Sequence, residues 1–238
     1  MISYEYPLSE RVRTLLRLED LYERVDFFMS KNDPLEHHVA LLSVFEILEV
    51  SSRADLKSDL LQELERQKQT LEALQDNPEI SQEALDNVLW QIDQASSRLF
   101  QASGKVGQEL RENEWLMSIK QRTSIPGGVC EFDLPSYHYW LQQGADQRRQ
   151  DLQQWLAPFL PIRDGIAIVL KLLRESGKTS TQIACQGVYQ QMMAGRIAQM
   201  LRIRLNRDYR CVPEISANKY ALNIRFTTQE GIQRPRAA

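Results

Sequence analysis

Four basic side chains near the C-terminal end of the sequence have the chemistry to bind an anion. Arg202 and Arg204 are two residues apart in one apolar run, and Lys219 and Arg225 belong to a second. An arginine guanidinium is planar and forms paired, charge-assisted hydrogen bonds with a carboxylate or a phosphate, and a lysine ammonium adds a point charge. These residue types predict a surface that binds an acidic ligand.

The other reactive residue types do not form a catalytic or metal-binding pattern. His37 and His38 are adjacent, so on a helix they do not face one metal ion, and His138 stands among aromatic residues. The three cysteines are widely spaced, which fits neither a zinc site nor a disulfide framework and indicates a reducing compartment. The GxSxG, HExxH, GxxxxGK and GxGxxG motifs are absent from the sequence. We therefore predict a protein that is not an enzyme and that uses no cofactor and no metal.

Charge is divided unevenly along the chain. From residue 178 onwards there are ten lysines and arginines against three acidic residues, a net charge of +7. The whole chain of 238 residues has a formal net charge of −3, which leaves −10 on the first 177 residues. Such a division is informative about partners, because the basic part favours a polyanion, an acidic peptide or the acidic face of the same protein.

The apolar residues predict a soluble protein. The longest apolar run, residues 165–173, contains Lys171 and is much shorter than the roughly 20 residues that span a membrane. The first residues, Met-Ile-Ser-Tyr-Glu-Tyr-Pro, do not resemble a signal peptide. We expect a cytoplasmic protein that does not bind a membrane.

Three interpretations of the basic C-terminal residues stay open. The simplest is a strand face whose charges contact water. A nucleic acid matches the charge, but the aromatic residues do not alternate with the arginines as a base-stacking surface requires. An acidic peptide suits arginines and lysines that lie beside apolar side chains.

The elements that position these residues are helical in the first three quarters of the chain. Ser9 and Asp33, the latter followed by proline, are start signals for two helices. Leucines and other apolar residues then recur at helical spacing over residues 54–75 and 81–102, and Asp-Asn-Pro separates the two runs. We expect these runs to form a long antiparallel helical hairpin.

Residues 121–141 form a connector rich in turn signals and aromatic residues. Proline fixes its own φ at position 126, and two glycines follow it. Cys130, Phe132 and Leu134 then alternate with polar residues as in a short buried strand. We therefore expect a packed connector that contains one strand.

Period-2 alternation marks the strands. Apolar residues alternate over residues 2–6, 197–205 and 220–226, and residues 181–192 also resemble a strand. The sequence predicts an α+β protein with a mostly helical domain at 8–176, which contains the connector. We expect a small antiparallel β domain at 178–230, joined by the N-terminal strand 2–6, with its arginines on one face.

Several sequence segments together resemble the ZapD family of bacterial cell-division factors. They are YEYPLSERVRTLLRLE at 4–19, LLQELERQKQ at 60–69, QRTSIPGG at 121–128, CEFDLP at 130–135, LPSYHYWL at 134–141 and NIRF at 223–226. The resemblance runs the length of the chain. It implies a symmetric homodimer that binds the C-terminal tail of the tubulin-like protein FtsZ and bundles FtsZ filaments at the mid-cell Z-ring, without catalysis.

The resemblance also implies which residues bind the FtsZ tail. The family's positively charged surface corresponds here to Arg17, Arg53, His138 and Arg225, with Lys219 as a neighbour. Glu114 and Ala221 stand where the family pattern has arginine, so this surface is expected to be less positive or displaced. Arg111, Arg202 and Arg204 are the candidate substitutes.

Overall fold

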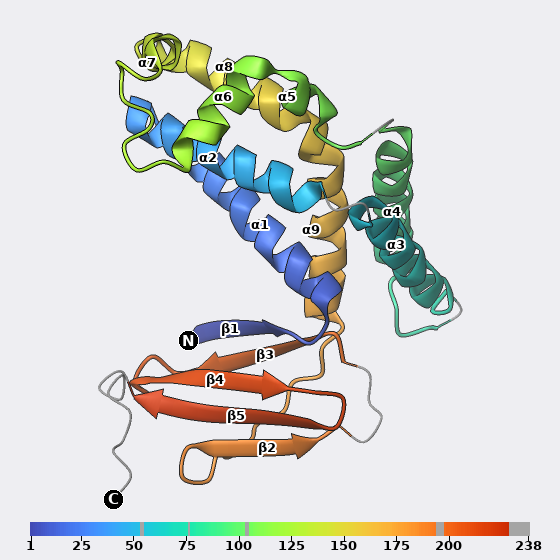
Figure 1. Ribbon diagram of the computed structural model, residues 1–238. Helices are drawn as coiled ribbons and strands as arrows, with labels where there is room; N and C mark the ends of the chain where they lie inside the picture. Colours follow the sequence, from blue (N-terminus) through green and yellow to red (C-terminus); the bar gives the residue numbers. More distant parts are fainter. Residues whose placement is uncertain (53–54, 76, 103–104, 194–197, 229–238) are drawn as a thin grey trace, which may run out of the picture. The chain divides into compact units, whose positions relative to one another are not determined.

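The computed structural model describes residues 1–52, 55–75, 77–102, 105–193 and 198–228 (Figure 1). The chain divides into two compact units. The helical unit is Leu15–Leu172, and the strand unit combines Met1–Thr14 with Leu173–Ala238. The helices and small antiparallel sheets of the described chain confirm the predicted α+β class.

The first two helices begin where the sequence predicts. Their bounds are α1 (Glu10–Met29), α2 (Pro34–Ser51), α3 (Leu56–Glu72), α4 (Gln82–Gln101), α5 (Gln108–Glu112), α6 (Glu114–Thr123), α7 (Pro135–Leu141), α8 (Ala145–Leu156), a 3-10 turn η1 (Ala157–Phe159) and α9 (Leu160–Glu175). The Ser9 hydroxyl accepts a hydrogen bond from the Val12 N–H at 3.3 Å, and the Asp33 carboxylate accepts one from the Leu35 N–H at 2.8 Å. Both predicted N-caps are confirmed, since each satisfies an amide that the first helical turn leaves unpaired.

The core of the helical unit lies along helices α1, α2 and α9. Each contributes fully buried aliphatic side chains, among them Leu15, Leu18, Val25, Leu41, Val44, Ile47, Ile162, Ile166 and Val169. Burial of each such side chain contributes about 1.5–3 kcal/mol to folding. The Tyr22 hydroxyl, also buried here, donates a hydrogen bond to the Phe159 carbonyl at 2.9 Å, and burial raises the pKa of Tyr22.

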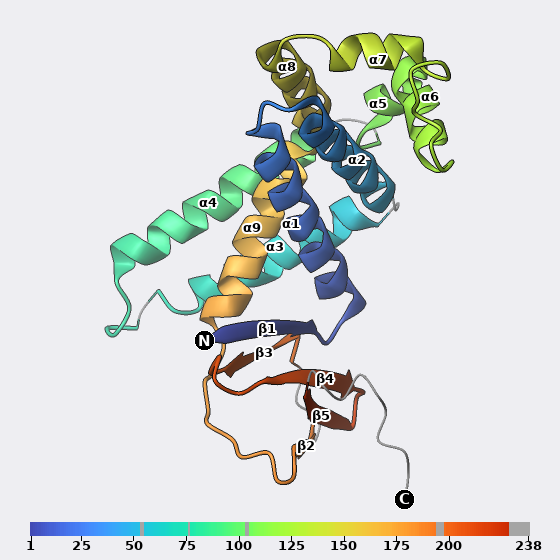
Figure 2. The ribbon, with the colours of Figure 1, turned by 90° about the vertical axis from the view of Figure 1, so that its left-hand side faces the viewer.

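Helices α3 and α4 lie side by side and confirm the predicted antiparallel hairpin (Figures 1 and 2). Lys68 of α3 and Asp93 of α4 form an ion pair across it at 2.7 Å. The hairpin also packs closely on α9, because a Cβ atom added at Gly165 would lie 2.9 Å from Cδ2 of Leu60. A larger residue at position 165 would therefore force the buried Leu60 side chain to shift.

The predicted strand within the connector is wrong. The N–H groups of Asp133 and Leu134 both donate to the Cys130 carbonyl at 3.0 Å, so these residues form a tight turn that leads directly into α7. Phe132, expected to be buried, is 81% exposed. Alternation over three apolar residues is too short a signal to separate a strand from successive turns, and Gly127, with φ +70°, favours turns.

The strand unit contains two antiparallel sheets. In the first, β1 (Ile2–Pro7) pairs with β3 (Met200–Leu205). In the second, β5 (Ala221–Thr228) lies between β2 (Val188–Met192) and β4 (Cys211–Ala217). Of the residues expected to resemble a strand at 181–192, those before Val188 form a loop and a tight turn.

The predicted alternation of the last strand is confirmed within β5. Leu222 and Ile224 are buried, whereas Arg225, which follows Ile224, is exposed. Tyr220, expected on the apolar face, precedes β5 and is 63% exposed. Because successive side chains of a strand point to opposite faces, burying the aliphatic residues turns Arg225 outward.

Candidate functional site

Three of the predicted cationic residues of the strand unit are exposed and available to a ligand. Arg204 lies on β3 opposite Ser3, and Arg225 lies in the middle of β5, between Val188 and Glu214 in the register. Neither guanidinium forms an ion pair with a residue that the structure describes. Each therefore keeps its full hydrogen-bonding capacity for an external carboxylate or phosphate.

Lys219 lies in the turn that joins β4 to β5. Its ammonium is 4.8 Å from the centre of the Tyr220 ring, a cation–π contact that orients the side chain without neutralising it. The turn is closed by the Asn218 side chain, whose oxygen accepts hydrogen bonds from the N–H groups of Tyr220 and Ala221 at 2.8 and 2.9 Å. Ala221, where the family pattern has arginine, adds no charge at this position.

Arg202 differs from these residues because the protein itself supplies its partner. Its Nη2 lies 2.8 Å from the carboxylate of Glu5, the residue opposite it in the β1–β3 register, and Arg174 contacts the same carboxylate at 2.8 Å. The hydrogen bonds from Arg174 and then from Arg202 lower the pKa of Glu5. This clamp ties β1 to β3 and to the end of α9, so Arg202 is placed to hold the fold together.

A pocket of about 510 Å3 adjoins Lys219 within the strand unit. Its walls combine apolar residues, among them Pro7, Leu8 and Met193, with polar ones, and they carry the charged side chains of Glu10, Arg13 and Lys219. The guanidinium of Arg13 forms an ion pair with Glu10 at 2.9 Å and lies 5.8 Å from the Tyr6 ring centre. Of the two cations in the pocket wall, Arg13 is paired with Glu10, whereas Lys219 forms no ion pair with a described carboxylate.

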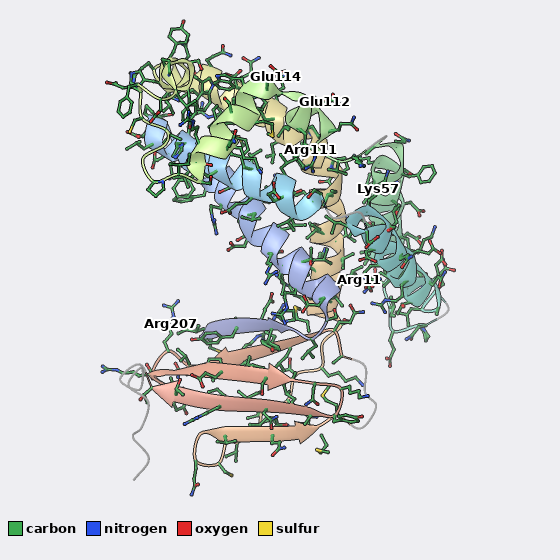
Figure 3. The ribbon with its side chains drawn as sticks, in the orientation of Figure 1. Arg11, Lys57, Arg111, Glu112, Glu114 and Arg207 are labelled. Atoms are coloured by element: carbon green, nitrogen blue, oxygen red, sulfur yellow. The ribbon has the colours of Figure 1, made fainter. Side chains whose placement is uncertain are left out.

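The remaining predicted residues belong to the helical unit. Arg17 is exposed on α1 and forms no ion pair with a described residue. Arg111, half-buried on α5, donates to the Leu48 carbonyl at 3.3 Å. Glu112 and Glu114 lie close to it along the chain, at the end of α5 and the start of α6 (Figure 3). Both carboxylates therefore lie within three residues of Arg111 along the chain.

His138 lies on α7 with its Nε2 3.7 Å from the carboxylate of Glu131. Arg17, Arg111 and His138 thus stand on three different helices, and Arg53 lies outside the described residues. Arg204, Lys219 and Arg225 all belong to the strand unit, Arg204 on the β1–β3 sheet and the other two on β5 and the turn before it. The sequence analysis missed the ion pair of Arg13 with Glu10, although the Ser9 N-cap places these residues one helical turn apart. It also missed the role of Glu5, because the pairing of β1 with β3 joins residues far apart in the sequence.

The described residues also bear on two other possibilities, a membrane-spanning helix and a metal site. Within the described ranges, no helix is long and apolar enough to cross a membrane. No group of three or more His, Cys, Asp or Glu side chains gathers as metal ligands would in the same part of the chain.

Comparison with known proteins identifies the family. Residues 16–225 match the family model of ZapD, described as a cell division protein. The chain belongs to the ZapD family. It is 63% identical over its full length to the cell division protein ZapD of Azoarcus sp. (strain BH72), covering 95% of that protein. It is 60% identical, again over its full length, to the ZapD of Aromatoleum aromaticum, of which it covers 93%.

A third ZapD, from Dechloromonas aromatica (strain RCB), is 59% identical over 227 residues, which are 95% of this chain and 90% of that protein. Because the matches span nearly the whole of each relative, the helical and strand units both belong to the family's shared architecture. A role in cell division follows from membership of the ZapD family.

Proposed function

We propose that this ZapD-family chain binds the acidic and apolar C-terminal tail of FtsZ and, as a symmetric homodimer, cross-links FtsZ filaments at the mid-cell Z-ring. The protein works in the cytoplasm by binding alone, without catalysis or a cofactor. The tail-binding residues are Arg17, Arg53, His138, Lys219 and Arg225, with Arg111 and Arg204 as further contacts.

The observation that carries this proposal is the set of exposed cations in the strand unit. Arg204, Lys219 and Arg225 are exposed and form no ion pair with a described residue, and Glu214 is the acidic residue opposite Arg225 in the register. Lys219 borders a pocket whose walls are partly apolar. An acidic peptide with apolar side chains matches both properties, since its carboxylates pair with the cations and its apolar groups fill the pocket. A solvated strand face needs no such pocket.

The dimer supplies the cross-link. Two tail sites related by a twofold axis engage tails from neighbouring filaments, so modest single-site affinity is raised by effective concentration. We assign the pairing surface to the helical unit and the connector, because large apolar side chains are exposed there. Ile125 is 48%, Phe132 81% and Tyr139 70% exposed.

Titration with two ligands tests the proposal. The full chain is titrated at physiological salt with a fluorescent FtsZ tail peptide and, separately, with a fluorescent DNA duplex, and anisotropy is measured. We expect saturable peptide binding that weakens as salt is raised, because salt shortens the distance over which exposed charges attract one another, which is about 10 Å at 0.1 M salt. Binding of the duplex in preference to the peptide would replace this proposal with nucleic-acid recognition.

A further inference from the structure

Strand β2 has one edge paired with β5 and one edge open. The Met193 N–H donates to the Tyr220 carbonyl at 2.7 Å, and the Phe226 N–H donates to the Gly187 carbonyl at 2.8 Å. In an antiparallel ladder, alternate residues direct their backbone groups to the same side. From Gly187 to Met193, every second residue therefore faces β5.

The residues in between direct their backbone groups away from β5. They are Val188, Gln190 and Met192. The Val188 N–H donates to the Cys185 carbonyl at 2.9 Å in a tight turn. The N–H and C=O groups of Gln190 and Met192 have no partner in the part of the chain that the structure describes. These four groups are a template for one more strand.

The opposite edge of the same sheet is protected, and this edge is not. Strand β4 carries Pro213, which is paired with Phe226 in the register. At this position the backbone groups of β4 point to its outer edge, and proline has no N–H, so the outer edge of β4 lacks a donor there. Proline and charge are the usual means by which proteins block edge pairing. Strand β2, with the sequence VYQQM, contains neither.

The chain's own preceding segment does not close the edge. Gln186 and Gly187 have φ values of +51° and +75°, so Cys185–Val188 is a two-residue hairpin turn with positive φ at both central positions. Such a turn would start a strand beside β2, but pairing stops at the single Cys185–Val188 bridge. Ile183, two residues before the turn, is 83% exposed.

The side chains beside the open edge indicate what kind of peptide would bind there. Arg225 is opposite Val188 in the register, so both point to the same face of the sheet, where Val188 is 50% and Met192 66% exposed. An added strand would lie about 4.8 Å beyond β2. Cys185 already occupies the position opposite Val188, so the added strand would pair with Gln190 and Met192. Its residue opposite Gln190 would point to the face that carries Arg225, where a carboxylate is favoured, and its residue opposite Met192 would contact an apolar side chain.

We propose that the open edge of β2 binds an extended acidic and apolar peptide as an additional antiparallel or parallel strand of the β2–β5–β4 sheet. This proposal rests on the proposed function, because it takes the FtsZ tail as that peptide. Main-chain hydrogen bonds to Gln190 and Met192 hold the peptide, and Arg225 selects its acidic residue.

The test combines backbone variants with amide exchange of the full chain. Gln190→Pro removes one open-edge donor and leaves the ladder with β5 intact, whereas Gln190→Ala removes the same side chain and keeps the donor. We expect Gln190→Pro to weaken FtsZ-tail peptide binding about tenfold and Gln190→Ala to leave it nearly unchanged. Circular dichroism and Tm confirm that both variants fold.

Amide exchange separates the possible occupants of the edge. Saturating peptide is expected to slow exchange of the Gln190 and Met192 amides and to leave the Val188 amide unchanged. If wild-type protein binds the peptide but these amides are not protected, the edge proposal is wrong and the proposed function stands. If they are protected without peptide and lose protection on dilution, a second copy occupies the edge, and the proposal is equally wrong. If wild-type protein does not bind the peptide, the proposed function itself fails.

Discussion

Nε of Arg148 donates a hydrogen bond to Nδ1 of His37 at 2.9 Å, deep in the helical unit. The other ring nitrogen of His37, Nε2, lies 2.8 Å from the Lys31 carbonyl, so it carries the proton and the ring is neutral. Arg148 also donates to the carbonyls of Leu141 and Asn32 at 2.9 and 2.6 Å. One buried guanidinium thus joins the start of α2, the end of α7 and the loop before α2.

This arrangement makes stability dependent on pH. Burial chiefly, and also the charge of Arg148, lower the pKa of His37 below its ordinary 6.5. The unfolded chain therefore binds more protons below about pH 6.5, so the contribution of neutral His37 is present above that pH and is lost as the pH falls through the native pKa. We expect the free energy of unfolding to fall by up to about 1.4 kcal/mol per pH unit from this group.

Urea denaturation of the wild type and of His37→Gln at pH 7.5 and 5.5 measures this effect. His38, whose pKa burial also lowers, is retained in both proteins and cancels in the comparison. The stability advantage of the wild type is expected to shrink at pH 5.5. Parallel loss in the two proteins would show that His37 does not titrate as described.

Gly107 combines a left-handed backbone with a crowded environment. Its φ is +72°, and an added Cβ would lie 2.6 Å from Leu48 and 2.7 Å from Phe159. Gly127 has nearly the same φ, +70°, with no neighbouring atom within 4 Å. We expect Gly127→Ala to cost about 1–2 kcal/mol of unfolding free energy from backbone strain and Gly107→Ala about 1–3 kcal/mol more from overpacking. Equal losses in urea denaturation would contradict the packing at Gly107.

Local sequence signals correctly predicted where the first two helices begin, but they did not predict the structure of the connector. The Ser9 and Asp33 caps depend on residues two or three positions away, so short-range sequence is sufficient to find them. The alternation at Cys130 and Phe132 is equally local, but whether it forms a strand depends on a neighbouring strand to pair with. Successive turn hydrogen bonds satisfy the connector's backbone instead.

Arg202 and Arg204 are expected to have opposite roles, although they lie two residues apart on β3. Arg202→Met removes hydrogen bonds to Glu5, and we expect it to lower the free energy of unfolding by about 1–2 kcal/mol and to leave tail binding intact. Arg204→Met is expected to leave stability within about 0.5 kcal/mol and to weaken tail binding. Urea denaturation and peptide anisotropy on both variants measure the contrast, and identical behaviour of the two variants would contradict it.

The same pair shows why the candidate site was only partly predictable. Both arginines have the same residue type, strand and apolar neighbours, so local sequence does not distinguish them. Glu5 is 197 residues away in the sequence, but the β1–β3 register places it opposite Arg202, whose guanidinium it binds. A count of charges identifies a basic region, whereas the pairing of distant strands decides which charges remain for a partner.

Dimerisation through the connector is tested with two exposed phenylalanines. Phe132 is 81% exposed in the connector, and Phe100 is 77% exposed on α4. We expect Phe132→Asp to shift the protein from dimer to monomer at micromolar concentration, because a charge replaces a side chain that the partner buries. Phe100→Asp makes the same chemical change on α4 of the helical unit, so its oligomeric state shows whether the pairing surface extends from the connector to the hairpin. Sedimentation equilibrium reports both, and a monomeric wild type would remove the geometry for cross-linking.

Co-sedimentation of FtsZ filaments with Arg225→Glu tests the central claim most directly. Arg207→Glu, in the turn after β3, makes the same change in net charge and is the matched control, and both variants are first shown to be folded dimers. Because Arg225 provides an unpaired cation in the middle of β5, we predict that Arg225→Glu loses filament bundling and that Arg207→Glu retains most of it. Bundling by Arg225→Glu at the wild-type level would contradict the account.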